Sequence, residues 1–132
     1  MREKRSFPER PESVTAARRF ATEVLQGAPT QIIATVELLV SELATNCIRH
    51  TDSAFDLTIA KTTREIRVEA TDYAVGEPTM RSPKPTDTNG RGLRIVDALA
   101  SSWGVEHRPS HGKTVWFTIA VQAPDRATQL AS

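Results

Sequence analysis

The sequence predicts an α+β fold, a two-layer sandwich in which helices cover one face of a mixed, mainly antiparallel sheet. Two patterns carry this prediction. In three segments the apolar residues recur every three or four positions, which is typical of amphipathic helices. In several others they alternate with polar residues, as in half-buried strands. The segments follow the order strand, helix, helix, strand, strand, loop, helix, strand, strand, which favours helices packed on one face of the sheet.

The bulk properties indicate one ordinary globular domain. We expect residues 1–132 to form a single domain with its core at about 7–121 and a frayed tail at 123–132. A net charge of +1 gives no sign of direct nucleic-acid binding. There is no run of 18 apolar residues and no apolar segment near the start, so neither a membrane span nor a signal peptide is expected. The single Cys47 cannot form an internal disulfide. Together these features favour a cytoplasmic protein.

The first fifty residues predict an edge strand and two helices. Residues 1–10 are polar with one Phe, as in a short edge strand. The apolar residues of 11–27 fall at helical spacing, and Gly27 is a plausible stop. A second helix is expected from Thr30 to about His50. Its apolar positions lie within roughly 100° of arc and are Ile33, Val36, Val40, Leu43, Ala44 and Cys47.

The rest of the sequence, after about residue 50, predicts two hairpins with a loop and a helix between them. Residues 56–63 and 64–72 alternate around a turn near Thr63, which predicts the first hairpin. Residues 73–92 hold three Pro and three Gly, and such long loops are often functional lids. The stretch "GLRIVDALA" then resumes helical spacing at Leu93, Val96, Leu99 and Ala100. "WGVEHRP" and "KTVWFTIAVQ" predict the second hairpin.

A polar stripe on the second helix is the first candidate for chemistry. Glu42, Asn46 and His50 are each four residues apart. A step of four advances about 40° around a helix and about 6 Å along it. The three side chains therefore form one row beside the apolar face. Spacing alone fits the wall of a cleft and a solvated helix flank equally well.

A carboxylate at a strand end is the second candidate. Asp72 continues the alternation of Ile66, Val68 and Ala70, so it is expected to point to the same face. A carboxylate on a core-facing side needs a hydrogen-bond donor, and the amino group of a ligand is one candidate. An Asp that has turned away to start the loop is the alternative.

Two glycine-containing stretches complete the set. In "NGRGLRIV", Gly90 and Gly92 are expected immediately before a helix, where free backbone N–H groups attract phosphate. Their spacing fits neither the dinucleotide fingerprint nor the Walker loop, and a simple turn is the alternative. In "HGKTVWF", Gly112 is expected in a turn that Lys113 and Thr114 follow at the start of the last strand.

Taken in order, these stretches resemble the GHKL ATPases, the superfamily of histidine kinase-, gyrase- and Hsp90-like nucleotide-binding domains. Within it the chain looks most like the anti-sigma factor serine/threonine kinases. "VSELATNCIRH" resembles their Asn-bearing helix box, "VEATDYAVG" their first glycine box, "GRGLRIVDALASSWGV" their second, and "GKTVWFTI" their closing strand. The resemblance extends from about Phe7 to Val121 and implies the Bergerat-type ATP-binding fold.

The resemblance implies a role for each of the three polar residues that form the stripe in the helix box. Asn46 would hold a Mg²⁺ ion that bridges the phosphates of ATP. Glu42 would be the catalytic base that polarises the attacking hydroxyl group. His50, at a matching position of the stripe, would contact phosphate or support the lid at 77–89.

The other boxes are implied to bind the nucleotide. Asp72 would accept a hydrogen bond from the adenine amino group, and Gly76 would let the chain pass close to the base. Gly90 and Gly92 would present N–H groups to the phosphates, and Leu93 of the same box is assigned to the nucleotide site. Thr114 would support Asp72 near the adenine, directly or through water.

The implied function is that of a protein kinase that regulates transcription. The chain would use ATP and Mg²⁺ to phosphorylate an anti-anti-sigma (STAS-type) partner and would sequester a sigma factor, as a homodimer. One departure favours an alternative. The family's first box reads Asp-x-Gly-x-Gly, but Ala74 replaces its first Gly here, and Ala tolerates positive φ less well. The alternative is a non-catalytic nucleotide-binding module that acts by sequestration alone.

Overall fold

The fold is a single five-stranded sheet covered by three helices. The structure, a computed structural model, describes residues 1–50, 53–73, 88–108 and 112–121. In chain order the elements are β1 (Arg2–Phe7), α1 (Glu12–Val24), α2 (Thr30–His50), β2 (Phe55–Lys61), β3 (Glu65–Asp72), α3 (Thr88–Leu99), β4 (Ser102–Arg108) and β5 (Gly112–Ala120). The strand order is β1-β2-β3-β5-β4, and every neighbouring pair among these strands is antiparallel. The predicted α+β class is confirmed, but this sheet is antiparallel throughout rather than mixed.

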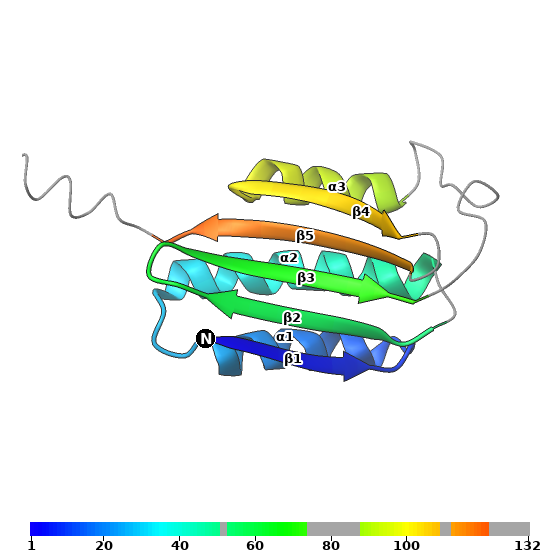
Figure 1. Cartoon of the computed structure of the whole chain (residues 1–132), viewed down its shortest axis with the longest axis horizontal. Coiled ribbons are helices and arrows are strands. Elements are labelled where there is room, and N and C mark those ends of the chain that lie inside the picture. Colours follow the sequence, from blue (N-terminus) through cyan, green and yellow to red (C-terminus); the bar gives the residue numbers. More distant parts are fainter. Residues whose placement is uncertain (51–52, 74–87, 109–111, 122–132) are drawn as a thin grey trace, which may run out of the picture.

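The helices lie together on one side of the sheet (Figure 1). α2 runs behind the middle strands, with α1 on the β1 side and α3 on the β4 side. α2 packs against both other helices and against β3 and β5. Figure 1 also shows that the end of α2, the end of β3, the start of β5 and the start of α3 gather at one end of the molecule. The predicted two-layer arrangement is therefore confirmed.

Strand alternation divides the sheet into two faces. We call the side that packs on the helices the inner face, and on β3 its buried residues are Ile66, Val68, Ala70 and Asp72. Opposite them on β5 lie Val115, Phe117 and Ile119. The other side, the outer face, is mainly polar. There the guanidinium of Arg67 lies 4.3 Å from the ring centroid of Trp116 and donates a hydrogen bond of 2.8 Å to Glu69.

α2 is the central core helix. Its residues Val36, Leu39 and Val40 are completely buried, and Leu43 is 1% exposed. The segment Thr30–Arg49 is long and apolar enough to cross a membrane by length and composition, a test that core helices also pass. Here the apolar side of the helix is covered by the sheet and by α1, so its hydrophobicity is accounted for by the core.

The edge strand and first helix are held by an aromatic cluster. Phe7, at the end of β1, lies 5.5 Å from Phe55 and 6.0 Å from Phe20, measured between ring centroids. The hydroxyl of Ser13 donates a hydrogen bond of 2.6 Å to the carbonyl of Pro8, which fixes the entry to α1. The predicted edge strand is confirmed, and α1 is somewhat shorter than the predicted 11–27.

Two expectations in the region after β3 need correction. The predicted loop at 73–92 is too long, because α3 begins at Thr88 and includes Gly90 and Gly92. Glycine is unfavourable in the interior of a helix, which is why the sequence pattern placed both glycines before the start of α3. The cost is smaller in a first turn, where N–H groups have no intrahelical partner. Leu99, placed on the apolar stripe by spacing, is 46% exposed, because it is the last residue of α3.

Candidate functional site

The candidate site begins with a buried amide on α2. Asn46 is only 8% exposed, and its Oδ1 is buried without a hydrogen-bond partner among the described residues. Glu42 lies one turn earlier on the same side of the helix and is half-buried. A buried acceptor left unsatisfied costs about 1–3 kcal/mol. The amide oxygen is therefore available to a group that the described residues do not supply.

Asp72 is the second element of the site. It is 3% exposed and ends β3 on the inner face, paired in register with Phe55. This confirms the position expected from alternation and excludes the alternative in which the residue has turned away to start the loop. The carboxylate stands where the apolar side chains of the inner face give way to the end of the sheet.

Cys47 shows that α2 and the strand ends meet. Burial and, to a lesser extent, the nearby Asp72 carboxylate raise the pKa of this thiol to about 12, although the ammonium of Lys113 opposes the rise. All three side chains therefore lie within electrostatic reach of one another. Cys47 remains protonated at neutral pH and is a packed thiol, not a nucleophile.

Gly112 brings β5 against the end of β3. Its φ is +93°, a conformation that favours glycine, and a Cβ built on it would lie 1.9 Å from the carbonyl oxygen of Asp72. No side chain fits there. The sequence suggested only a turn at this residue, whereas the structure shows that the glycine permits close approach of the two backbones beside the candidate site.

Thr114 lies apart from Asp72. In the register Thr114 pairs with Thr71, and their hydroxyl groups are 2.8 Å apart on the outer face. Asp72 is on the inner face, so the two side chains are separated by the sheet itself. The register does not bring the Thr114 side chain next to Asp72, and its expected support through water stays a prediction. The residue that pairs with Asp72 is Lys113.

The start of α3 contributes backbone groups. Gly90 and Gly92 are the third and fifth residues of this helix. Because the first four N–H groups of a helix have no intrahelical partner, Gly90 can offer a donor to an anion, whereas Gly92 lies past those four groups. Leu93 is half-buried and packs against the core, which holds α3 beside α2.

A polar network on the outer face fixes the residue after Asp72. The Tyr73 hydroxyl donates a hydrogen bond of 2.5 Å to Asp56, and its backbone N–H donates one of 3.2 Å to Ser53. Asp56 also accepts a hydrogen bond from Ser6 and lies 3.5 Å from the Lys4 ammonium. Although burial opposes ionisation, these partners lower the pKa of Asp56. Sequence reasoning missed this network, because its members are far apart in the chain.

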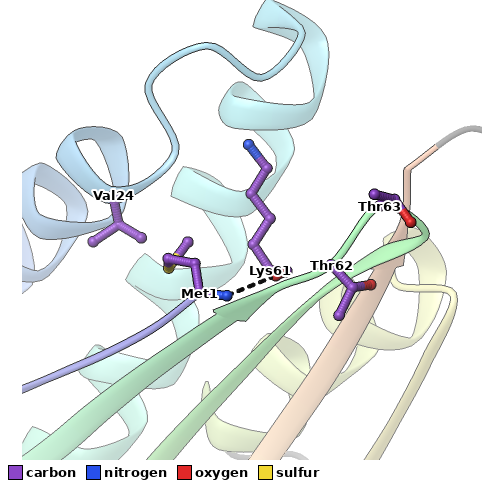
Figure 2. A pocket seen from close by; sticks show the side chains of 5 residues that line it. All are labelled: Met1, Val24, Lys61, Thr62 and Thr63. Carbon is purple, nitrogen blue, oxygen red and sulfur yellow. Dashed lines mark hydrogen bonds between the residues drawn. The ribbon is translucent and has the colours of Figure 1, made fainter.

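Several other residues of the predicted site and tail lie outside the part of the chain that the structure describes. Gly76, Ala74 and residues 77–87 of the expected lid lie outside the described residues, as do the side chain of His50 and the tail at 123–132. Figure 2 shows an open hollow lined by Met1, Val24, Lys61, Thr62 and Thr63. It lies where β2 ends and β3 begins, at the other end of the hairpin from Asp72, and so is separate from the candidate site.

Comparisons with known proteins agree with this geometry. The sequence model of the family described as the histidine kinase-like ATPase domain matches residues 7–119. Among solved structures, the fold is similar to the histidine kinase domain of a blue-light activated histidine kinase from Erythrobacter litoralis, with a TM-score of 0.57 and 21% sequence identity. That match covers 92% of this chain and 64% of the other. A search of curated proteins found no match.

Proposed function

This chain belongs to the family of histidine kinase-like ATPase domains, the GHKL type of ATP-binding module, and from that premise we propose that it is a serine/threonine protein kinase of the anti-sigma factor type. It binds ATP and Mg²⁺ where α2 meets the end of β3 and the start of β5. It then transfers phosphate to a Ser or Thr hydroxyl of an anti-anti-sigma (STAS-type) partner in the cytoplasm, and it sequesters a sigma factor as a homodimer.

The observation that carries the proposal is that the buried Oδ1 of Asn46 has no hydrogen-bond partner among the described residues. Mg²⁺ prefers oxygen ligands and is usually held by a few protein oxygens together with phosphates and water. Among the residues searched, which are those the structure describes, no group of three His, Cys, Asp or Glu side chains could hold a metal ion. A site with one amide oxygen from the protein fits both facts. Asn46 would hold the ion, which when bound neutralises phosphate charge.

The nucleotide would lie across the end of the sheet. Asp72, buried at 3% exposure, would accept a hydrogen bond from the amino group of the base. The first turn of α3 would receive the phosphates, with Gly90 and Gly92 allowing close approach of the backbone. Gly76 and His50 keep their implied roles in this proposal, Gly76 beside the base and His50 beside the phosphates or in support of the lid.

Glu42 supports transfer over binding alone. Phosphoryl transfer depends mainly on positioning and charge neutralisation, and a carboxylate base assists when the acceptor is a hydroxyl group. Glu42 lies one helical turn from Asn46 and is half-buried. It could therefore face a hydroxyl group brought to the phosphate end of the site, whereas a module that only binds nucleotide has no use for a base.

Two measurements test the proposal. Calorimetry should show binding of ATP with Mg²⁺, and radiolabelled ATP should label an added STAS-type partner on Ser or Thr. Glu42→Gln should abolish labelling while leaving ATP affinity within a few-fold of the wild type. Glu65→Gln, an exposed Glu at the opposite end of β3, serves as the matched control.

The alternative function has a distinct outcome. Ala74, in the first glycine box, favours a module that binds nucleotide and acts by sequestration alone. ATP binding without labelling of any partner, in a chain that still forms a complex with a sigma factor, would support that function over the kinase.

A further inference from the structure

Lys113 occupies a position on β5 that faces the candidate site. It continues the alternation of Val115, Phe117 and Ile119, all of which lie on the inner face. Its register partner on β3 is Asp72. Directly paired residues of antiparallel strands have Cβ atoms about 4.5–5.5 Å apart on the same face. The lysine side chain therefore starts beside the buried carboxylate.

The electrostatics of Cys47 agree with this placement of the lysine. The Lys113 ammonium lowers the pKa of the Cys47 thiol, whereas the Asp72 carboxylate raises it. Cys47 belongs to α2, which covers the inner face. The ammonium and the carboxylate therefore both lie within electrostatic reach of the Cys47 thiol, and Lys113 is half-buried.

An acceptor and a donor side by side have a definite chemical complement. Ionised Asp only accepts hydrogen bonds, and the Lys ammonium only donates them. Adenine presents a donor amino group flanked by acceptor ring nitrogens, whereas guanine presents acceptors at O6 and N7. An Asp–Lys pair therefore matches either edge of adenine that includes its amino group. Guanine docked in the same orientation as adenine would set its O6 against the carboxylate.

We propose that Lys113 is a base-recognition residue that donates a hydrogen bond to a ring nitrogen of adenine while Asp72 accepts one from its amino group. This inference rests on the proposed function, because it requires that ATP bind at this site. It adds the residue that contacts the second position of the base.

The test pairs a protein change with a ligand change. Dissociation constants are measured for ATP, 1-deaza-ATP and 7-deaza-ATP, each of which lacks one ring nitrogen, with the wild type and Lys113→Met. The wild type should bind ATP about tenfold or more tightly than one of the two analogues, as expected for one charge-assisted hydrogen bond. Lys113→Met should weaken ATP binding by a similar factor, and its preference for ATP over that analogue should disappear.

The control and the contrary outcomes separate the possible failures. Lys61→Met, at the distant hollow, should keep both the affinity and the preference. If Lys113→Met weakens binding but keeps the preference, the lysine acts only on Asp72 and the inference is overturned. Equal binding of all three ligands by the wild type overturns it without any variant. A wild type that binds none of them refutes the proposed function and the inference together.

Discussion

Replacing Asn46 with Leu should stabilise the free protein and abolish its response to nucleotide. Leu has nearly the shape of Asn but carries no polar atoms, so the change leaves little cavity at this buried position. It removes an acceptor whose Oδ1 has no partner among the described residues. An unsatisfied buried polar group costs about 1–3 kcal/mol. The free energy of unfolding without ligand should therefore rise by about 1–2 kcal/mol.

The assay is urea unfolding with and without ATP and Mg²⁺. In the wild type, a ligand at 100 times its dissociation constant adds about 2.7 kcal/mol to the free energy of unfolding. Asn46→Leu should lose most of this increment, because the proposed metal ligand is gone. By heat, each kcal/mol corresponds to a shift of about 4 °C for a domain of this size. Gln31→Leu, an exposed amide on the same helix, should change neither quantity appreciably.

Two results would refute this reasoning. If Asn46→Leu lowers the free energy of unfolding by more than about 1 kcal/mol without ligand, the amide is a structural residue whose interactions outweigh its desolvation cost. If the variant keeps the full increment with ATP and Mg²⁺, Asn46 takes no part in binding, whatever its effect on stability.

Three further predictions concern the groups around the site. Gly112→Ala should destabilise the fold by at least about 2 kcal/mol in urea unfolding, because its Cβ would meet backbone at 1.9 Å; Gly27→Ala, at φ +98° with no atom within 4 Å, should cost less. The Cys47 thiol, with its pKa raised from 9.0 to about 12, should resist thiol reagents in the native state. It should also contribute stability that is full below pH 9 and lost as the pH rises towards 12, a loss absent in Cys47→Ala. Because the pKa of Asp56 is lowered from 3.8, the contribution of this residue to the free energy of unfolding should be present above about pH 4 and lost below it. Tyr73→Phe should reduce that acid-dependent contribution when unfolding is compared at pH 7 and pH 3.

Periodicity predicted those parts of the fold and site that depend on which face a side chain occupies. The helical spacing of α2 placed Asn46 beside the apolar face, and alternation placed Asp72 on the inner face. Both positions follow from the geometry of a single element. The roles of these residues in binding ATP stay predictions, since they depend on a ligand.

Contacts between elements could not be predicted in the same way. The link from Tyr73 to Asp56 joins residues that the sequence separates by the whole of the β2–β3 hairpin. The start of α3 was placed too late, because a glycine-rich first turn has the composition of a loop. In both cases tertiary packing, which the local pattern does not contain, decided the structure.

The case of Thr114 shows that the face of the sheet on which a strand residue lies depends on its place in the alternation, not on the motif to which it belongs. The resemblance to the family's closing Gly-x-Thr strand assigned the Thr114 hydroxyl as the support of Asp72. The register pairs Thr114 with Thr71 on the outer face, and a shift of one residue along a strand exchanges the faces. Lys113 therefore takes the inner position. A neutral hydroxyl can donate or accept, whereas an ammonium can only donate. Because it can only donate, Lys113 requires an acceptor on the base, so loss of the ring nitrogen that it contacts should cost more affinity here than at a site with a hydroxyl group.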